Sequence, residues 1–317
     1  MLLPLVILNP SSASGTTGAN WPGLASELRT HFGPFQVKFT EKRGDAAALA
    51  GEAARKGTDL IIACGGDGTI SEVANGILNS GKQAELGILP SGTGGDFRRT
   101  LDIPTRPSEA AKILKQGKTQ AIDVGRVTYL SADGVSQSRY FLGVASFGMS
   151  AEVVQRVKSA GPDWLPADAS KWLSGRLSFG ISMLQTALRS PATKVIVQLD
   201  DEPERHLTVA NLCVANARYF GGGMKIAPEA SLTDGKFDVV SIGDLGALKI
   251  LANAPRLYVG THLSLDRVAH ALAKKVEARP GDNEGEILLE VDGELPGRLP
   301  ATFQIVPHAL GIRCPTL

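Results

Sequence analysis

Short apolar segments alternate with helical patterns along the first third of the chain. The apolar runs predict strands at residues 5–9, 35–40, 60–64 and 86–90. Helical patterns follow them at residues 21–31, 46–56, 70–78 and 107–116. Strands that alternate with helices of about ten residues are typical of an open, mostly parallel sheet. The first part of the chain is therefore predicted to be an open α/β domain.

The pattern changes near residues 121–126 and becomes mainly β. Strands are predicted at residues 124–129, 140–145, 193–200, 207–215, 237–242, 268–277, 287–291 and 301–306. Helices are predicted at residues 171–189 and 245–260. Successive strands separated by turn residues are typical of a β-sandwich or another β-rich domain. We therefore predict an α/β protein with an N-terminal domain over residues 1–122 and a β-sandwich-like domain over residues 123–306.

The composition is that of a globular protein without a dominant charge. Hydrophobic residues make up 43% of the chain, and 33 Lys and Arg residues balance 32 Asp and Glu residues. This balance argues against a nucleic acid partner, because such proteins usually concentrate positive charge. No stretch reaches the roughly 18 uncharged apolar residues that span a bilayer. Three widely separated cysteines without a CxxC motif favour reduced, buried thiols in a cytoplasmic protein.

A glycine cluster lies between a predicted strand and a predicted helix. Its sequence is Gly65-Gly66-Asp67-Gly68-Thr69. Glycines let the backbone approach an anion closely, and the first N–H groups of a helix attract phosphate. The simpler interpretation is a sharp turn in which Thr69 caps the helix, and neither standard nucleotide-binding fingerprint is present. Alone, the cluster indicates an anion near a helix start.

Two further polar turns follow strands that are predicted to lie in the same sheet. Residues 90–99, with the sequence PSGTGGDFRR, follow the fourth strand, and Asn9-Pro10-Ser11 follows the first. Ligands of open α/β sheets bind at the carboxyl ends of the strands. Three such turns at one edge favour a ligand site there.

These three turns, in this order, resemble the motifs of the diacylglycerol kinase catalytic-domain family. That family includes bacterial lipid kinases and sphingosine kinases and has NAD kinases as more distant relatives. The resemblance covers nearly the whole chain and implies two domains with a cleft between them, and a final segment, residues 307–317, that returns to the N-terminal domain. The sequence departs from the family pattern at Gly95, where Asn is usual, and has no Lys close after Asn9-Pro10.

The resemblance also implies that ATP is bound by residues of these turns. The residues are Asn9, Pro10, Ser11, Thr40, Gly65, Gly66, Asp67, Gly68, Thr69 and Thr93. Asp96 and Asp123 would form a network with water and Mg2+, and Arg99 would reach the phosphates. Asp123, a lone polar residue in an apolar run, is also compatible with a structural carboxylate, and Arg99 with a solvated side chain.

Phosphoryl transfer needs an acceptor hydroxyl that is positioned and deprotonated, so carboxylates in turns are the next candidates. Asp292-Gly293-Glu294 follows the predicted strand at residues 287–291. It matches the Asp-Gly-Glu that carries the acid–base function in the resembled family. Asp-Gly between two extended runs is equally a simple hairpin signal. The spacing leaves open which of Asp292 and Glu294 takes the proton.

A second turn with a carboxylate precedes the predicted strand at residues 237–242. It resembles the family's metal-binding stretch, which implies Mg2+ ligands from the side chains of Ser231 and Asp234 and the backbone carbonyl of Lys236. Mg2+ prefers such oxygen ligands. The resemblance implies a structural or regulatory Mg2+ site, separate from the Mg2+ that accompanies ATP, and the alternative is a plain turn into a strand.

The segment at residues 164–189, which includes the helix predicted at residues 171–189, combines apolar and aromatic residues with Lys171, Arg176 and Arg189. Helices of this kind lie at membrane interfaces, although an apolar helical face more often packs in a core. This segment is the best candidate for transient contact with a membrane that presents a lipid substrate. A peripheral position at the inner membrane surface is therefore expected, and a homodimer is possible.

Together these features predict an ATP-dependent, Mg2+-requiring kinase that phosphorylates the hydroxyl of diacylglycerol or a similar lipid. One alternative is a kinase of a soluble alcohol, as in the NAD kinases. Another is a non-catalytic nucleotide-binding regulator on the same fold. Asp292 and Glu294 weigh against the regulator, because a sensor needs no base.

Overall fold

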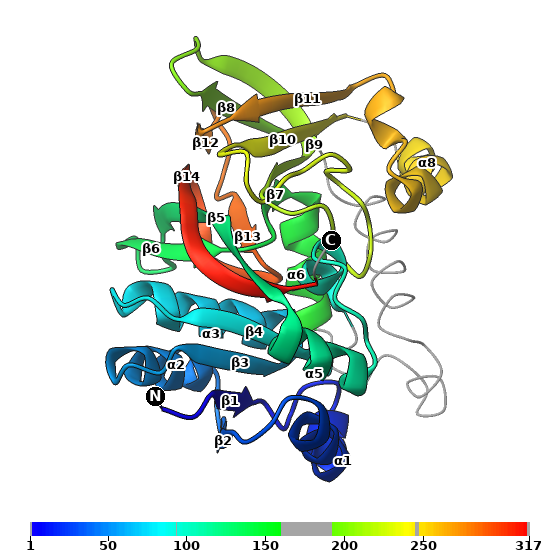
Figure 1. Ribbon diagram of the computed structural model, residues 1–317. Coiled ribbons are helices and arrows are strands. Elements are labelled where there is room, and N and C mark those ends of the chain that lie inside the picture. Colours follow the sequence, from blue (N-terminus) through cyan, green and yellow to red (C-terminus); the bar gives the residue numbers. More distant parts are fainter. Residues whose placement is uncertain (1, 93, 160–191, 245–246, 316–317) are drawn as a thin grey trace. The chain divides into compact units, whose positions relative to one another are not determined.

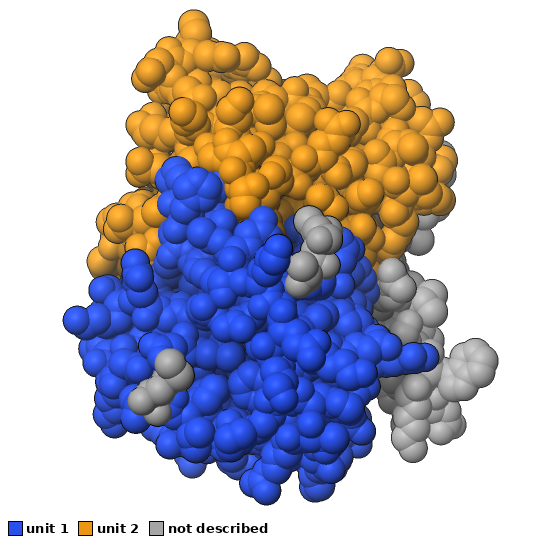
Figure 2. All heavy atoms as spheres, in the orientation of Figure 1, with its two compact units in different colours: residues 1–124, 307–317 blue, residues 125–306 orange. Residues whose placement is uncertain are grey.

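The computed structural model describes residues 2–92, 94–159, 192–244 and 247–315. Contacts divide the chain into unit 1, residues 1–124 and 307–317, and unit 2, residues 125–306 (Figures 1 and 2). The predicted boundary at residue 122 lies two residues before the division after residue 124. The chain passes from one unit to the other twice, through the long strands β5 (Lys118–Leu130) and β14 (Glu294–Cys314).

Unit 1 is built on a parallel sheet in the order β14-β4-β3-β1-β2 (Figure 1). The strands are β1 (Leu5–Leu8), β2 (Gln36–Phe39), β3 (Leu60–Gly65), β4 (Glu85–Pro90) and the end of β14. Every residue of β1 and β3 is buried. Strands buried on both faces need continuous apolar runs, which is why LVIL and LIIACG lack the alternation of a half-exposed strand.

The helices of unit 1 pack as two pairs, α2 with α3 and α1 with α5. Their bounds are α1 (Thr16–His31), α2 (Asp45–Arg55), α3 (Asp67–Asn79), α4 (Asp96–Thr100) and α5 (Pro107–Gln116). At Gly76 of α3, a Cβ atom would lie 2.2 Å from the carbonyl oxygen of Ala47. Only glycine therefore permits this approach of α3 to α2.

Unit 2 is mainly antiparallel, and six of its strands form a closed circuit of pairings, β9-β7-β13-β14-β12-β8 and back to β9. β10 and β11 extend the β9 side, and β6 pairs with β5. The strands are β6 (Ser136–Phe141), β7 (Val144–Gly148), β8 (Thr193–Leu199), β9 (Arg205–Ala215), β10 (Phe237–Gly243), β11 (Val268–Ala273), β12 (Lys275–Pro280) and β13 (Leu288–Val291). The helices are α6 (Met149–Ser159), α8 (Ala247–Val259) and the short η2 (His262–Ser264).

Aromatic and aliphatic side chains fill the interior of unit 2. Phe141 stacks on Phe237 with ring centroids 5.6 Å apart, and the ring of Phe303 meets Phe141 edge-on. All three rings are fully buried. The predicted fold class, an open α/β domain followed by a β-sandwich-like domain, is confirmed. Within the described ranges no helix is long and apolar enough to cross a membrane.

Two predictions of single strands are wrong. Residues 140–145 contain the end of β6 and the start of β7, and residues 268–277 contain β11 and the first half of β12. At the second break the Asp200 carboxylate accepts the N–H groups of Lys274 and Lys275, at 2.9 and 2.8 Å, and turns the chain. The α6 helix was not predicted, and the predicted helix at residues 171–189 lies outside the described residues.

Candidate active site

The turns after β1, β3 and β4 of unit 1 are tied to one another. The Asn9 backbone N–H donates to the carbonyl of Cys64 in β3 at 3.0 Å, and its side-chain amide donates to the Thr69 hydroxyl of α3 at 3.3 Å. The Asn9 Oδ1 accepts the N–H of Ser11 at 3.0 Å. Asn9 therefore fixes the first turn against the glycine loop.

The two glycine loops touch through their backbones. Ser91 donates its N–H to the carbonyl of Gly65 at 3.2 Å. A Cβ atom on Gly92 would lie 2.5 Å from the Cα of Gly66, closer than real Cβ atoms approach. Two loops that follow separate strands are thus held as one backbone surface at the end of the sheet.

We expect Gly92→Ala to weaken ATP binding and to destabilise the protein. The added methyl must push one loop away from the other, and such overpacking costs about 1–3 kcal/mol. Gly23→Ala in α1 is the control, because a Cβ there meets no atom of the described residues within 4 Å. Calorimetric ATP titration and thermal unfolding of both variants provide the comparison, and unchanged ATP affinity in Gly92→Ala would separate this contact from nucleotide binding.

Asp67 joins the first glycine loop to the second. Its Oδ2 accepts the N–H of Asp96 and its Oδ1 accepts the N–H of Phe97, both at 3.1 Å. The α3 helix begins at Asp67, with Gly66 as its N-cap and no side-chain cap. The expectation that Thr69 caps this helix is therefore wrong, and Thr69 is instead buried and accepts from Asn9.

A cluster of charges lies at the start of α4. Arg99 donates to Asp96 at 2.6 Å, and Arg98 donates to the carbonyl of Ile103 at 3.2 Å. Burial and, secondarily, the positive charge of Arg99 lower the pKa of the Arg98 guanidinium. Gly95, which precedes the cluster, adopts φ 66°, a conformation that favours glycine.

The other predicted nucleotide-binding residues of unit 1 are placed as follows. Thr40 is buried directly after β2, and its N–H donates to the carbonyl of Leu8 at 2.9 Å. Pro10 accepts the N–H of Gly18 at 3.2 Å, and Gly68 is exposed in the first turn of α3. Thr93 lies outside the described residues.

Asp123 is completely buried in β5. Its Oδ1 accepts the backbone N–H of His308 at 2.8 Å, and the His308 Nδ1 lies 3.6 Å away. This contact joins the end of the N-terminal segment to the returning segment 307–317. The structural alternative for Asp123 therefore has a definite partner, and the Mg2+ role stays a prediction.

Asp292 and Gly293 form a tight hairpin between β13 and β14. Their φ values are 49° and 82°, and Val291 pairs with Glu294 across the turn. Two positive φ values in a two-residue loop characterise a type I′ hairpin, for which Asp-Gly is a preferred sequence. The hairpin interpretation is therefore confirmed as structure, and it leaves the acid–base role open.

The Asp292 carboxylate folds back onto the break between β6 and β7. It accepts the N–H groups of Leu142 and Gly143 at 3.0 and 2.9 Å. The carbonyl of Leu142 accepts from the Asn216 side chain at 2.9 Å. Glu294 lies 3.9 Å from Arg139. The backbone N–H groups that would extend a single strand through residues 140–145 are thus used to orient Asp292.

The predicted metal turn is also formed. The Asp234 Oδ1 accepts the N–H of Lys236 at 3.1 Å, and the Ser231 hydroxyl accepts the N–H of Thr233 at 3.3 Å. Asp234 is exposed, and Gly235 adopts φ 71°. In the described parts of the chain no three His, Cys, Asp or Glu side chains gather as a metal site. A cation at this turn would therefore rely on Asp234, a hydroxyl, backbone carbonyls and water, which are oxygen donors that suit Mg2+.

Comparison with known proteins decides the family. Residues 4–127 match the diacylglycerol kinase catalytic domain, and residues 143–314 match the YegS C-terminal NAD kinase beta sandwich-like domain. The diacylglycerol kinase of Mycobacterium tuberculosis is 33% identical over 314 residues, which cover 98% of this chain and 94% of that protein. The chain belongs to the diacylglycerol kinase catalytic-domain family. The predicted resemblance is thereby confirmed.

A further relative and two solved structures are also similar to this chain. The diacylglycerol kinase of Bacillus subtilis is 30% identical over 262 residues, covering 82% of this chain and 79% of that protein. A putative diacylglycerol kinase of Bacillus anthracis has a solved structure with a TM-score of 0.75, 24% identity and coverage of 98% and 96%. Yeast NADH kinase complexed with NADH gives a TM-score of 0.51 at 12% identity, covering 100% and 84%. Both structures show the shared fold.

Two side chains that hold the turns of this kinase family member in place, those of Thr17 and Glu290, were not predicted from the sequence. Thr17 of α1 donates to the carbonyl of Ser91 at 2.6 Å and accepts from the Ser91 hydroxyl at 2.8 Å. Glu290 contacts the hairpin through the N–H of Gly293 at 2.5 Å. The available signals were a Thr in a polar stretch and a Glu within an apolar strand, and neither identifies its partner.

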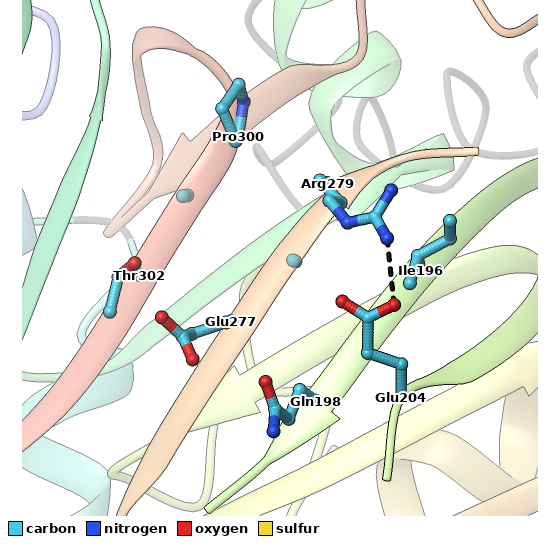
Figure 3. Close-up of a pocket in the computed structure, with 9 residues that line it drawn as sticks. Ile196, Gln198, Glu204, Glu277, Arg279, Pro300 and Thr302 are labelled. Carbon is cyan, nitrogen blue, oxygen red and sulfur yellow. Dashed lines mark hydrogen bonds and ion pairs between the residues drawn. The ribbon is translucent and has the colours of Figure 1, made fainter. Parts of the chain in front are cut away.

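A pocket of about 240 Å3 lies on unit 2 (Figure 3). It is lined by residues of β8, β12 and β14 together with Glu204, which forms an ion pair of 2.8 Å with Arg279. Of the predicted site residues that the structure describes, none lines it. The pocket therefore adds nothing to the kinase assignment.

Proposed function

We propose that this chain is an ATP-dependent lipid kinase that transfers the γ-phosphate of ATP to the hydroxyl of diacylglycerol or a similar lipid. The observation that carries the proposal is the 33% identity to a diacylglycerol kinase over 98% of the chain. The chain also keeps the three polar turns at one end of the parallel sheet.

The proposal assigns nucleotide binding to unit 1. Backbone N–H groups at the start of α3 and the joined glycine loops suit phosphate oxygens, because both present partial positive charge without side-chain hindrance. Mg2+ bound with ATP would neutralise the phosphates. Asn9 and Asp67 would hold the loops in the shape that phosphate requires.

Activation of the acceptor is assigned to the Asp292–Gly293–Glu294 turn of unit 2. One of its carboxylates takes the proton of the lipid hydroxyl. The hydroxyl oxygen then bonds to the γ-phosphorus while the bond from that phosphorus to the β–γ bridging oxygen breaks and ADP leaves. Asp292 accepts two backbone N–H groups, and such contacts would orient its carboxylate for a positioned reaction.

A kinase of a soluble alcohol is the second candidate. It is favoured by the fold shared with yeast NADH kinase, a relationship seen at 12% identity only. A non-catalytic regulator would bind ATP without transferring phosphate to any acceptor.

Radiolabel transfer separates these functions. Purified protein with γ-labelled ATP and Mg2+ is given diacylglycerol in mixed detergent micelles, or NAD or NADH in solution, and ATP binding is measured in parallel. We expect labelled phosphatidic acid from diacylglycerol. Labelling of the dinucleotides alone would establish the second candidate, and ATP binding without transfer to any acceptor would establish the regulator.

A lipid acceptor requires access to a membrane, so we also propose transient contact with the inner membrane surface. The segment at residues 164–189, the candidate for that contact, lies outside the described residues.

We expect Asp234→Ala to raise the Mg2+ concentration for half-maximal activity about tenfold or more, with little change in ATP affinity. The Mg2+ requirement should change because Asp234 is a proposed ligand, and ATP affinity should not, because the proposed metal site is separate from the nucleotide site. Asp133→Ala is the matched control, because Asp133 is also exposed and also precedes a glycine with positive φ. Mg2+ titrations of activity and of thermal stability check the prediction, and an equal loss of ATP affinity would contradict the separation.

A further inference from the structure

A buried carboxylate adjoins the hairpin that carries Asp292 and Glu294. Glu290 of β13 is 5% exposed. Its Oε1 accepts the N–H of Gly293 at 2.5 Å, and its Oε2 accepts the hydroxyl of Ser146 in β7. Both oxygens of a buried acid are therefore engaged by named donors, one of them in the turn itself.

An irregularity in the sheet accounts for the direction of this side chain. β13 and β14 pair Leu289 with Gly297 but Val291 with Glu294, so their register shifts across Glu290. Such a bulge re-aims a side chain, and bulges are common beside active sites. On its other edge, β13 keeps regular pairing, with Glu290 opposite Ser146. The bulge brings the Glu290 carboxylate within reach of the Gly293 N–H.

A chain of buried hydroxyl and amide groups continues from Ser146. The Ser150 hydroxyl, at the start of α6, lies 2.7 Å from the Ser146 hydroxyl and 2.8 Å from the Asn211 Oδ1 in β9. The Ser150 N–H also donates to the Asn211 Oδ1, at 3.0 Å. All three residues are buried. Glu290 thus anchors the hairpin to β7, α6 and β9.

We propose that Glu290 is a positioning residue for the Asp292–Gly293–Glu294 turn. The proposal rests on the proposed function, in which this turn supplies the base. The Gly293 N–H belongs to the peptide that joins Asp292 to Gly293, so a hydrogen bond to it orients the backbone of the turn that carries both candidate carboxylates. Leu142 and Gly143 hold Asp292 from one side, and Glu290 holds the next peptide through a separate network.

The network requires an acceptor at Glu290, and glutamine can supply it. In Glu290→Gln the amide oxygen would accept from Gly293 and the amide nitrogen would donate to Ser146. Ser146 would then donate to Ser150, and Ser150 to Asn211, because hydroxyl groups can reverse their direction of donation. Alanine leaves the Gly293 N–H without its acceptor. The two substitutions therefore separate positioning from charge.

The test compares Glu290→Ala, Glu290→Gln and the control Glu277→Ala in the full chain. Glu277 lies in β12 of the same unit and forms an ion pair with Lys275 at 3.0 Å. With diacylglycerol micelles and ATP, we expect Glu290→Ala to lower kcat about 10²-fold with unchanged KM for ATP, since small misplacements of reacting groups have effects of that size. Glu290→Gln should recover most of kcat. Amide exchange at Gly293, followed by NMR, should accelerate in the alanine variant only.

Wild-type kcat in a folded Glu290→Ala variant, or equal losses in Glu290→Ala and Glu290→Gln, would overturn the positioning role while leaving the kinase assignment intact. A wild-type protein that phosphorylates no lipid would overturn the proposed function and this inference together. If Glu290→Ala does not fold, Ser146→Ala is tested instead, because it removes the hydroxyl that donates to one Glu290 oxygen. A lowered kcat with unchanged KM for ATP would then support the proposal, and a wild-type kcat would contradict it.

Discussion

Replacing Asp67 with alanine is expected to lower phosphoryl transfer about 10²-fold or more while the protein stays folded. The substitution removes the acceptor for the N–H groups of Asp96 and Phe97, the link between the two glycine loops. Without that link the second loop can drift from the first, and the phosphates lose their joint backbone surface. Turnover and ATP affinity, measured at saturating lipid, check the prediction.

Asp45→Ala is a closely matched control for this variant. Asp45 is also the first residue of a helix, and its carboxylate accepts two backbone N–H groups, those of Glu41 and Lys42, both at 2.9 Å. Both substitutions therefore remove the same kind of loop anchor, but only Asp67 joins the glycine loops. Near wild-type turnover in folded Asp67→Ala, or an equal loss in Asp45→Ala, would remove the loop link from the mechanism.

Substitution of the hairpin carboxylates is expected to have an effect of similar size. If Glu294 is the base, Glu294→Gln lowers kcat by about 10²–10⁴ with little change in ATP affinity, the usual range for positioned acid–base catalysis. Glu286→Gln is the control, because Glu286 is also paired with an arginine, Arg298, at 3.2 Å near the same hairpin. The nucleotide is assigned to unit 1, so ATP titration separates loss of the base from loss of binding.

Asp292→Asn tests the other carboxylate, and the structure changes how its result is interpreted. Both Asp292 oxygens accept backbone N–H groups, so the asparagine amide would place a donor against the N–H of Leu142 or Gly143. An unsatisfied buried donor costs about 1–3 kcal/mol, so this variant loses stability as well as chemistry. Thermal unfolding must therefore accompany kcat. Nearly full lipid phosphorylation by both Glu294→Gln and Asp292→Asn would show that the turn has only a structural role and that the base is another residue.

The sequence by itself determined the fold class and the places where chemistry is expected. Apolar runs such as residues 60–64 identify buried parallel strands, and the glycines after them identify turns at the sheet edge. Asp292-Gly293 identifies a two-residue hairpin, because Asp-Gly readily adopts the positive φ values that such a turn requires. These features follow from preferences within a few neighbouring residues, because periodicity and φ preferences are local.

The tertiary structure alone decided which groups these turns contact. Leu142 and Gly143 lie between β6 and β7, and they are not part of a single strand because their N–H groups donate to a carboxylate about 150 residues further along the chain. Asp67 contacts Phe97, and Glu290 contacts Ser146. In both pairs the residues around each partner in the sequence do not predict the contact. The residue type shows that a polar side chain needs a hydrogen-bond partner when it is buried. Which partner lies within hydrogen-bond distance is decided only when distant strands fold into one sheet.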